Sequence, residues 1–127
     1  MNYYTDENIE MVKNHFNVDD MLNNLVKHGL IEELTGNYSE DITDMCNNCT
    51  LMLGKHLQTY ISADNIIVVE GVFNMMGNHT WIVIDDIIFD LSLAQFIPDA
   101  PKFSVLKENK YYHPINRSSF KEWLKTI

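Results

Sequence analysis

Three residue types that together perform thiol chemistry occur in order along the chain: Cys49, His79 and Asp90. Cysteine catalysis needs a thiolate, an imidazole that holds or accepts its proton, and usually a third group that orients the imidazole. Cys49 follows Asn47-Asn48, a pair of good helix-capping residues, so we expect it at or near the start of a helix. Free backbone N–H groups and the helix dipole at that position would favour the charged sulfur.

A tight hairpin is predicted to bring His79 and Asp90 together. Asp85-Asp86 separates two strand-like runs and has turn chemistry. If this pair is a two-residue turn, Asp90 lies opposite Trp81 and diagonal to His79, on one face of the sheet. The same register places an apolar set on the other face, where it can join a core: Ile82, Ile84, Ile87 and Phe89.

The remaining elements follow from apolar periodicity and turn signals. Helices are predicted from the Thr5-Asp6 start signal to Phe16, from Asp19 to Gly29, from Cys46 to Tyr60 and, behind the capping box of Ser119 and Glu122, from Phe120 to Lys125. Strands are predicted at 65–73, which is apolar enough for mid-sheet, and at 80–84 and 87–91. Residues 102–106 and 110–115 flank Glu108-Asn109 as a possible second hairpin, with Pro114 at an edge, and 35–44 is predicted as loop.

The order of these elements predicts an α+β fold in which the helices pack on one antiparallel sheet. The chain has 127 residues, of which 46% are hydrophobic and 21% charged, and it contains no repeat or linker. These values are typical of one globular domain, so we expect residues 1–127 to form a single domain with a core that needs no disulfide or metal.

The run from Asn78 to Phe96, NHTWIVIDDIIFDLSLAQF, resembles the His-x-Trp, acidic turn and Asp-x-Ser/Thr-x-x-Gln-Phe stretch of papain-like and transglutaminase-like cysteine enzymes, in particular small bacterial and phage members. The resemblance covers about residues 46–96. It implies a papain-like or transglutaminase-like fold in which Cys49 is the nucleophile, His79 the base and Asp90 the orienting acid. It also implies a peptidase, deamidase or acyl transferase that acts through a thioester.

Several neighbouring residues are expected to support this site. Cys46 precedes Cys49 by three positions, and a helix that begins at Asp44 would make Cys46 the nucleophile instead. Papain has a glutamine upstream of its cysteine, and this chain has none there, so the backbone N–H of Cys49 and an asparagine such as Asn48 are the expected oxyanion donors. Trp81 is expected to pack near the cysteine and His79. Gln95 is expected to close one end of the cleft that holds the catalytic residues.

Two other classes of function fit the same residues. A protein with this fold but without catalysis could be an acidic adaptor or inhibitor that binds a basic partner. Cys46 and Cys49, with His56 and His79 as further ligands, have a spacing that also suits zinc, although a second ligand pair is missing. The enzyme hypothesis itself requires no cofactor and no metal.

Nine basic residues against 18 acidic ones give a formal charge of −9, which argues against nucleic acid or an anionic membrane as partner. A peptide or protein substrate is the expected partner. The N-terminal sequence lacks the pattern of a secretory signal, and no apolar run approaches the roughly 20 residues that span a bilayer. We therefore expect a cytoplasmic protein with free cysteines.

Overall fold

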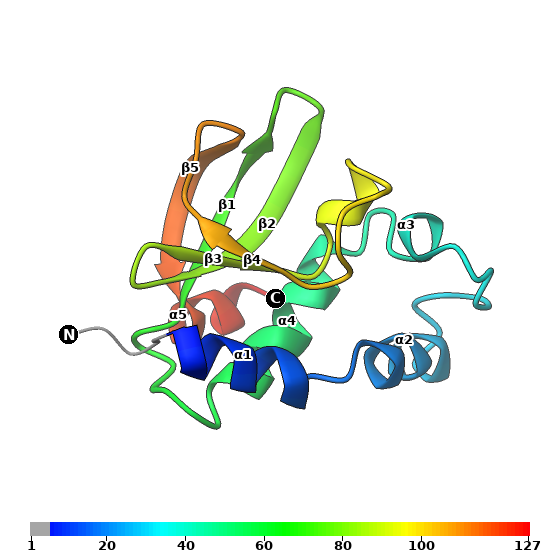
Figure 1. The fold of residues 1–127 in the computed structure, drawn as a ribbon, viewed down its shortest axis with the longest axis horizontal. Coiled ribbons are helices and arrows are strands. Elements are labelled where there is room, and N and C mark those ends of the chain that lie inside the picture. Colours follow the sequence, from blue (N-terminus) through cyan, green and yellow to red (C-terminus); the bar gives the residue numbers. More distant parts are fainter. Residues whose placement is uncertain (1–5) are drawn as a thin grey trace.

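The computed structural model describes residues 6–127, with side chains described from residue 10 onward. The predicted start signal at Thr5 and the side chain of Ile9 lie outside this part of the chain. The structure is α+β, as predicted: an open five-stranded antiparallel sheet in the order β4-β3-β2-β1-β5, with the helices gathered on one side of it (Figure 1). None of the helices described has the length and apolar character that crossing a bilayer requires.

The strands are β1 (Ile67–Phe73), β2 (Gly77–Ile84), β3 (Ile87–Asp90), β4 (Ser104–Lys107) and β5 (Tyr112–Ser119). The helices are α1 (Asp6–His15), α2 (Val18–Lys27), α3 (Tyr38–Asp41), α4 (Cys46–Leu57) and α5 (Phe120–Trp123), with short 3-10 helices η1 (Leu93–Gln95) and η2 (Leu124–Thr126). Helix α3 lies in the segment predicted as loop. It forms there because the Asn37 side chain accepts a hydrogen bond from the Glu40 N–H and so caps a single turn.

The hairpin of β2 and β3 has the predicted two-residue turn. Asp85 and Asp86 have φ of 52° and 66°, the left-handed geometry of a turn that matches the twist of paired strands. Ile84 pairs with Ile87, as the predicted register requires. Aspartate adopts this conformation more readily than most residues, which explains why an Asp-Asp pair can close the hairpin.

The sheet is buried on both faces. On the helix side, Ile82 and Phe89 join a core with Leu53 and Leu57 of α4. On the other face a second cluster is rich in aromatic side chains, with Phe73, Trp81, Val83, Ile88 and Tyr112 as members. Alternate residues of β2 therefore face two different environments, and His79 shares a face with Trp81.

The predicted second hairpin is wrong. β4 pairs with β3 and β5 pairs with β1, so the two segments lie at opposite edges of the sheet (Figure 1). Pro114 does lie in an edge strand, as expected from its missing N–H. The register of β5 shifts opposite Glu70 and Gly71, where Asn116 and Pro114 are the successive partners and Ile115 is left out of the pairing.

Helix α4 is held on the sheet partly by a close contact with α5. Gly54 of α4 faces the ring of Phe120, and a Cβ at Gly54 would lie 2.3 Å from the ring atom Cε1. Phe120 itself is fully buried. A glycine in mid-helix costs conformational entropy, so this contact gives a packing reason for its presence.

We predict that Gly54→Ala destabilises the protein although alanine is the better helix former. The gain in helix propensity is about 1 kcal/mol, and the overlap with Phe120 should cost more, for a net loss of about 1–3 kcal/mol. Urea unfolding measures the free energy of unfolding, with Lys55→Ala, an exposed neighbour in the same helix, as control. A Gly54→Ala variant more stable than the wild type would contradict this account of the packing.

Candidate active site

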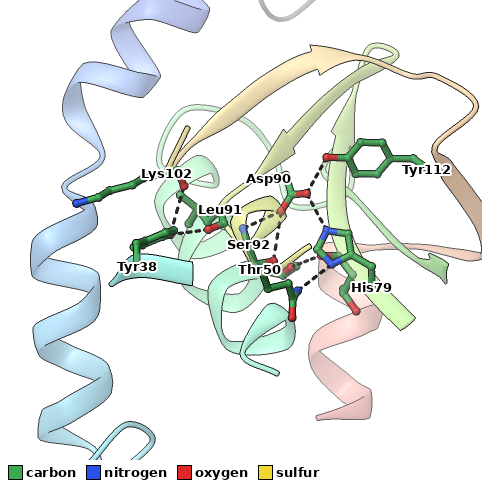
Figure 2. Close-up of polar contacts among 10 residues, drawn as sticks. Tyr38, Thr50, His79, Asp90, Leu91, Ser92, Lys102 and Tyr112 are labelled. Atoms are coloured by element: carbon green, nitrogen blue, oxygen red, sulfur yellow. Dashed lines mark hydrogen bonds and ion pairs between the residues drawn. The ribbon is translucent and has the colours of Figure 1, made fainter. Parts of the chain in front are cut away.

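The centre of the site is the Asp90 carboxylate, whose side chain is 1% exposed. One oxygen, Oδ2, accepts from His79 Nε2 at 2.7 Å and from the Tyr112 hydroxyl at 2.8 Å. The other, Oδ1, accepts from the Ser92 N–H at 2.8 Å. Figure 2 shows the carboxylate between these groups. A buried carboxylate without such donors would be strongly unfavourable, and here both of its oxygens are satisfied.

His79 is enclosed by aromatic rings. Its ring centroid lies 5.0 Å from that of Phe96, 5.6 Å from Trp81 and 6.1 Å from Tyr112. Burial lowers the pKa of His79, but the charge of Asp90 and hydrogen bonds to Asp90 and Cys46 outweigh it and raise this pKa to about 9. The imidazole is thus fixed in place and favoured in its charged form.

Cys46, and not Cys49, is the cysteine that reaches His79. Cys46 is the first residue of α4, whose cap residue Met45 provides no side-chain hydrogen bond to the helix end. Burial raises the pKa of Cys46, but its hydrogen bond with His79 and the charge of that ring outweigh the effect, so the pKa is lowered overall. The uncapped N–H groups of the first turn favour a thiolate in the same direction.

Cys49 lies one turn further along α4, in the helix-side core. It is 1% exposed, and burial followed by the charges of Asp90 and Cys46 raises its pKa. The predicted assignment of the nucleophile to Cys49 therefore disagrees with the geometry, because it treated Asn47-Asn48 as the helix cap. These residues lie inside α4, which begins at Cys46 as the apolar spacing predicted. The alternative left open for Cys46 agrees with it.

The predicted supporting residues divide into two groups. Trp81 packs against His79 and Tyr112 in the aromatic cluster. Asn48 does not face His79, and its amide instead donates to Met45 Sδ at 3.3 Å. The asparagine that faces the sheet is Asn47, whose Oδ1 accepts from the Thr80 hydroxyl at 2.7 Å and so fixes the start of α4 against β2.

Gln95 is brought to the histidine as well. Its Nε2 lies 3.3 Å from His79 Nδ1, and its Oε1 accepts from the backbone N–H of Asp44 at 3.2 Å. Because Oε1 accepts from Asp44, the Nε2 end of the Gln95 amide is the end that faces the His79 ring. Because an amide N–H can donate only to an unprotonated ring nitrogen, Gln95 and the Cys46 thiol compete for Nδ1.

Helix α3 holds the segment that carries Asp90 and Gln95. The Tyr38 hydroxyl donates to the carbonyl oxygens of Leu91 and Lys102, as Figure 2 shows, and the Ser39 hydroxyl donates to Ala94 at 2.7 Å. The sequence analysis did not single out Tyr38 or Ser39, because helix α3 was not predicted. Tyr112 was missed for a related reason: its place beside Asp90 depends on β5 pairing with β1.

A cavity of about 410 Å³ opens beside Cys46. This volume lies within the range of roughly 300–1,000 Å³ typical of small-molecule sites. Its lining consists of Cys46 and Asn47 from α4, Glu70 and Gly71 from β1, Asn78, His79 and Thr80 from β2, and Ile115 and Asn116 from β5. The half-buried thiol can therefore meet a molecule that enters from solvent.

The residues considered for zinc do not form a site of three or more metal-ligating side chains anywhere in residues 6–127. His56 lies on α4 between the rings of Phe16 and Tyr60, at 5.2 and 5.3 Å. Comparison of the chain with protein-family models, with curated proteins and with solved structures gives no match.

We predict that iodoacetamide alkylates Cys46 much faster than Cys49 at pH 6. The lowered pKa of Cys46 keeps its thiolate present as the pH falls below the ordinary thiol value, whereas the raised pKa of Cys49 keeps that sulfur protonated. Mass spectrometry of time points would give both rates on one protein, with an expected ratio of at least about 10. A Cys46 rate equal to that of glutathione at pH 6 would contradict a lowered pKa.

We also predict that Tyr112→Phe lowers the free energy of unfolding by about 1–3 kcal/mol, because the buried Asp90 carboxylate loses a donor. Tyr111→Phe is the matched control: it removes the same hydroxyl from an exposed neighbour. Chemical unfolding of both variants gives the comparison. Equal losses in the two would show that the hydroxyl on Asp90 does not stabilise the fold.

Proposed function

We propose that this protein is a thiol-dependent enzyme of the papain-like and transglutaminase-like kind, in which Cys46 attacks an acyl or amide carbonyl. The observation that carries the proposal is the continuous set of contacts from the Cys46 thiol through His79 to the buried Asp90. Order and placement support it further, since the cysteine begins a helix while the histidine and aspartate lie on neighbouring antiparallel strands. The resemblance of the run 78–96 to those enzymes agrees with this arrangement.

In the first step the Cys46 thiolate adds to the carbonyl carbon, and the electron pair of the C=O bond moves onto oxygen. Backbone N–H groups at the start of α4 have no intrahelical acceptor and can donate to that oxygen. His79 then gives its proton to the leaving amine or alcohol as the tetrahedral species collapses to a thioester. Asp90 stabilises the imidazolium throughout this step.

In the second step water or an amine attacks the thioester. His79, now neutral, takes the proton of the attacking group, and the Cys46 thiolate leaves with the bonding electron pair. Gln95 has to move from Nδ1 whenever that nitrogen carries a proton, so its amide can donate to the ring only while His79 is neutral, as it is after the thioester forms. Hydrolysis, deamidation and acyl transfer share this thioester, and a peptide or protein is the proposed acyl donor.

We predict that p-nitrophenyl acetate gives a burst of about one p-nitrophenol per chain, with the acetyl group recovered on Cys46. Cys46→Ala should abolish the burst, and Cys49→Ala should retain it, because that sulfur lies in the core. Stopped-flow absorbance follows the burst and peptide mapping locates the acetyl group. Cys49→Ala also controls for the loss of one thiol.

The burst distinguishes an enzyme from an acidic adaptor on the same fold. If folded wild-type protein releases p-nitrophenol no faster than an equal concentration of glutathione, the adaptor is the better assignment. Acetylation of Cys49 in place of Cys46 would overturn the choice of nucleophile.

A further inference from the structure

Glu70, Thr80 and Asn116 form the sheet side of the Cys46 cavity, which is its floor, and Glu70 is a carboxylate without a charge partner. Its side chain lines that cavity and the residue is half-buried. None of the ion pairs formed among the described residues involves Glu70. The cavity lining contains no lysine or arginine, and its one cationic group, His79, is paired with Asp90. Partial burial of a charge without a counterion is unfavourable, so a cation would gain by binding there.

The register places Glu70 close to the nucleophile. Glu70 pairs with Thr80 of β2 and with Asn116 of β5, so the three side chains share the helix-side face. Cβ atoms of such cross-strand partners lie about 5 Å apart. Thr80 in turn hydrogen-bonds Asn47 and interacts with the Cys46 thiol. The carboxylate is thus one strand spacing from a residue that contacts the reactive sulfur.

On the core side of Glu70, its neighbours on the same sheet face are apolar core residues, so an acidic side chain at this position is unusual. One step back along the same face of β1 lies Val68, which is fully buried in the helix-side core opposite Ile82. Beside the first turn of α4 the face continues with Glu70, Thr80 and Asn116. The register shift at Glu70 and Gly71 lies at the same place, and it leaves Ile115 exposed at the rim of the cavity. The floor is therefore a polar, acidic recess open to solvent.

We infer that the cleft takes a substrate whose acyl-donor residue carries a protonated amine or guanidinium group, held by Glu70 while its carbonyl meets Cys46. A lysine or arginine side chain has an apolar stem and a terminal charge, which match the exposed Ile115 at the rim and the carboxylate on the floor. The formal charge of −9 would attract such a substrate over a longer range. This inference rests on the proposed thiol chemistry and names its substrate class.

Charged methanethiosulfonates test the carboxylate without requiring turnover. Each forms a mixed disulfide with Cys46 and releases methanesulfinate, and the reagents differ only in the transferred group: trimethylammonioethyl, sulfonatoethyl or methyl. The measured quantity is the rate constant for modification of Cys46 by the cationic reagent divided by that for the anionic reagent. We expect Glu70→Gln to lower this ratio about fivefold at low ionic strength. Glu33→Gln, which removes the same charge from the exposed loop between α2 and α3, should change the ratio by less than twofold.

Two esters test the substrate class: the p-nitrophenyl esters of N-acetyl-lysine and of N-acetyl-norleucine, which differ in the terminal ammonium group. We expect kcat/KM to favour the lysine ester by about fivefold or more in the wild type, and Glu70→Gln to remove most of that preference. Agmatine should slow alkylation of wild-type Cys46 by iodoacetamide, and this protection requires no variant to fold.

The outcomes separate the two proposals. If Cys46 keeps its fast alkylation at pH 6 while Glu70→Gln leaves the reagent ratio unchanged, the Glu70 subsite is wrong and the thiol chemistry stands. Equal rates for the two esters in the wild type would overturn the substrate class. If Cys46 reacts with methyl methanethiosulfonate no faster than glutathione does, the proposed function fails. The ratio of cationic to anionic reagent rates would still report on Glu70.

Discussion

The buried hydrogen bond between Asp90 and His79 is the constraint on which the rest of the site depends. A carboxylate that is 1% exposed is tolerated only if its oxygens are satisfied, so the chain must deliver donors from three separate segments. Strand β2 supplies the histidine, the segment after β3 supplies the Ser92 N–H, and β5 supplies Tyr112. Loss of any one donor would leave part of the Asp90 charge unpaired among aromatic side chains, so the three contacts depend on one another.

The two cysteines differ in chemistry because they differ in depth along one helix. Residues three apart lie on similar faces of a helix and about 4.5 Å apart along its axis. Both sulfurs therefore point toward the sheet, but Cys49 is covered by the helix-side core while Cys46 lies at the open end beside a cavity. The first-turn position also exposes Cys46 to N–H groups that no side chain caps. One turn of helix is enough to separate a structural thiol from one with a lowered pKa.

Sequence alone was sufficient where a local rule determined the geometry. A two-residue turn at Asp85 and Asp86, together with the apolar strand pattern, predicted the register that joins His79 to Asp90, and both aspartates have the left-handed φ of such a turn. The start of α4 at Cys46 followed from the apolar spacing, but the choice between the two cysteines was harder, because Met45 is a cap residue without capping chemistry and the better caps, Asn47 and Asn48, lie inside the helix. Pairing of β5 with β1 depends on contacts across 40 or so residues, which no local pattern encodes. Tyr112 and the cavity floor therefore could not be predicted.

The cavity and the candidate nucleophile lie together at the start of α4. Helix α4 has 12 residues and covers about 18 Å, whereas β2 has 8 residues and spans about 26 Å. At the start of α4, its unpaired N–H groups lie beside a polar part of the sheet face, where the Thr80 hydroxyl donates to Asn47 and Glu70 lines the cavity. Carbonyl chemistry needs both features: donors for a developing negative charge and a wettable recess for the substrate. In the proposed enzyme, the acidic side chain of Glu70 would restrict what can approach, so the polar stretch of sheet that makes room for a substrate would also select its charge.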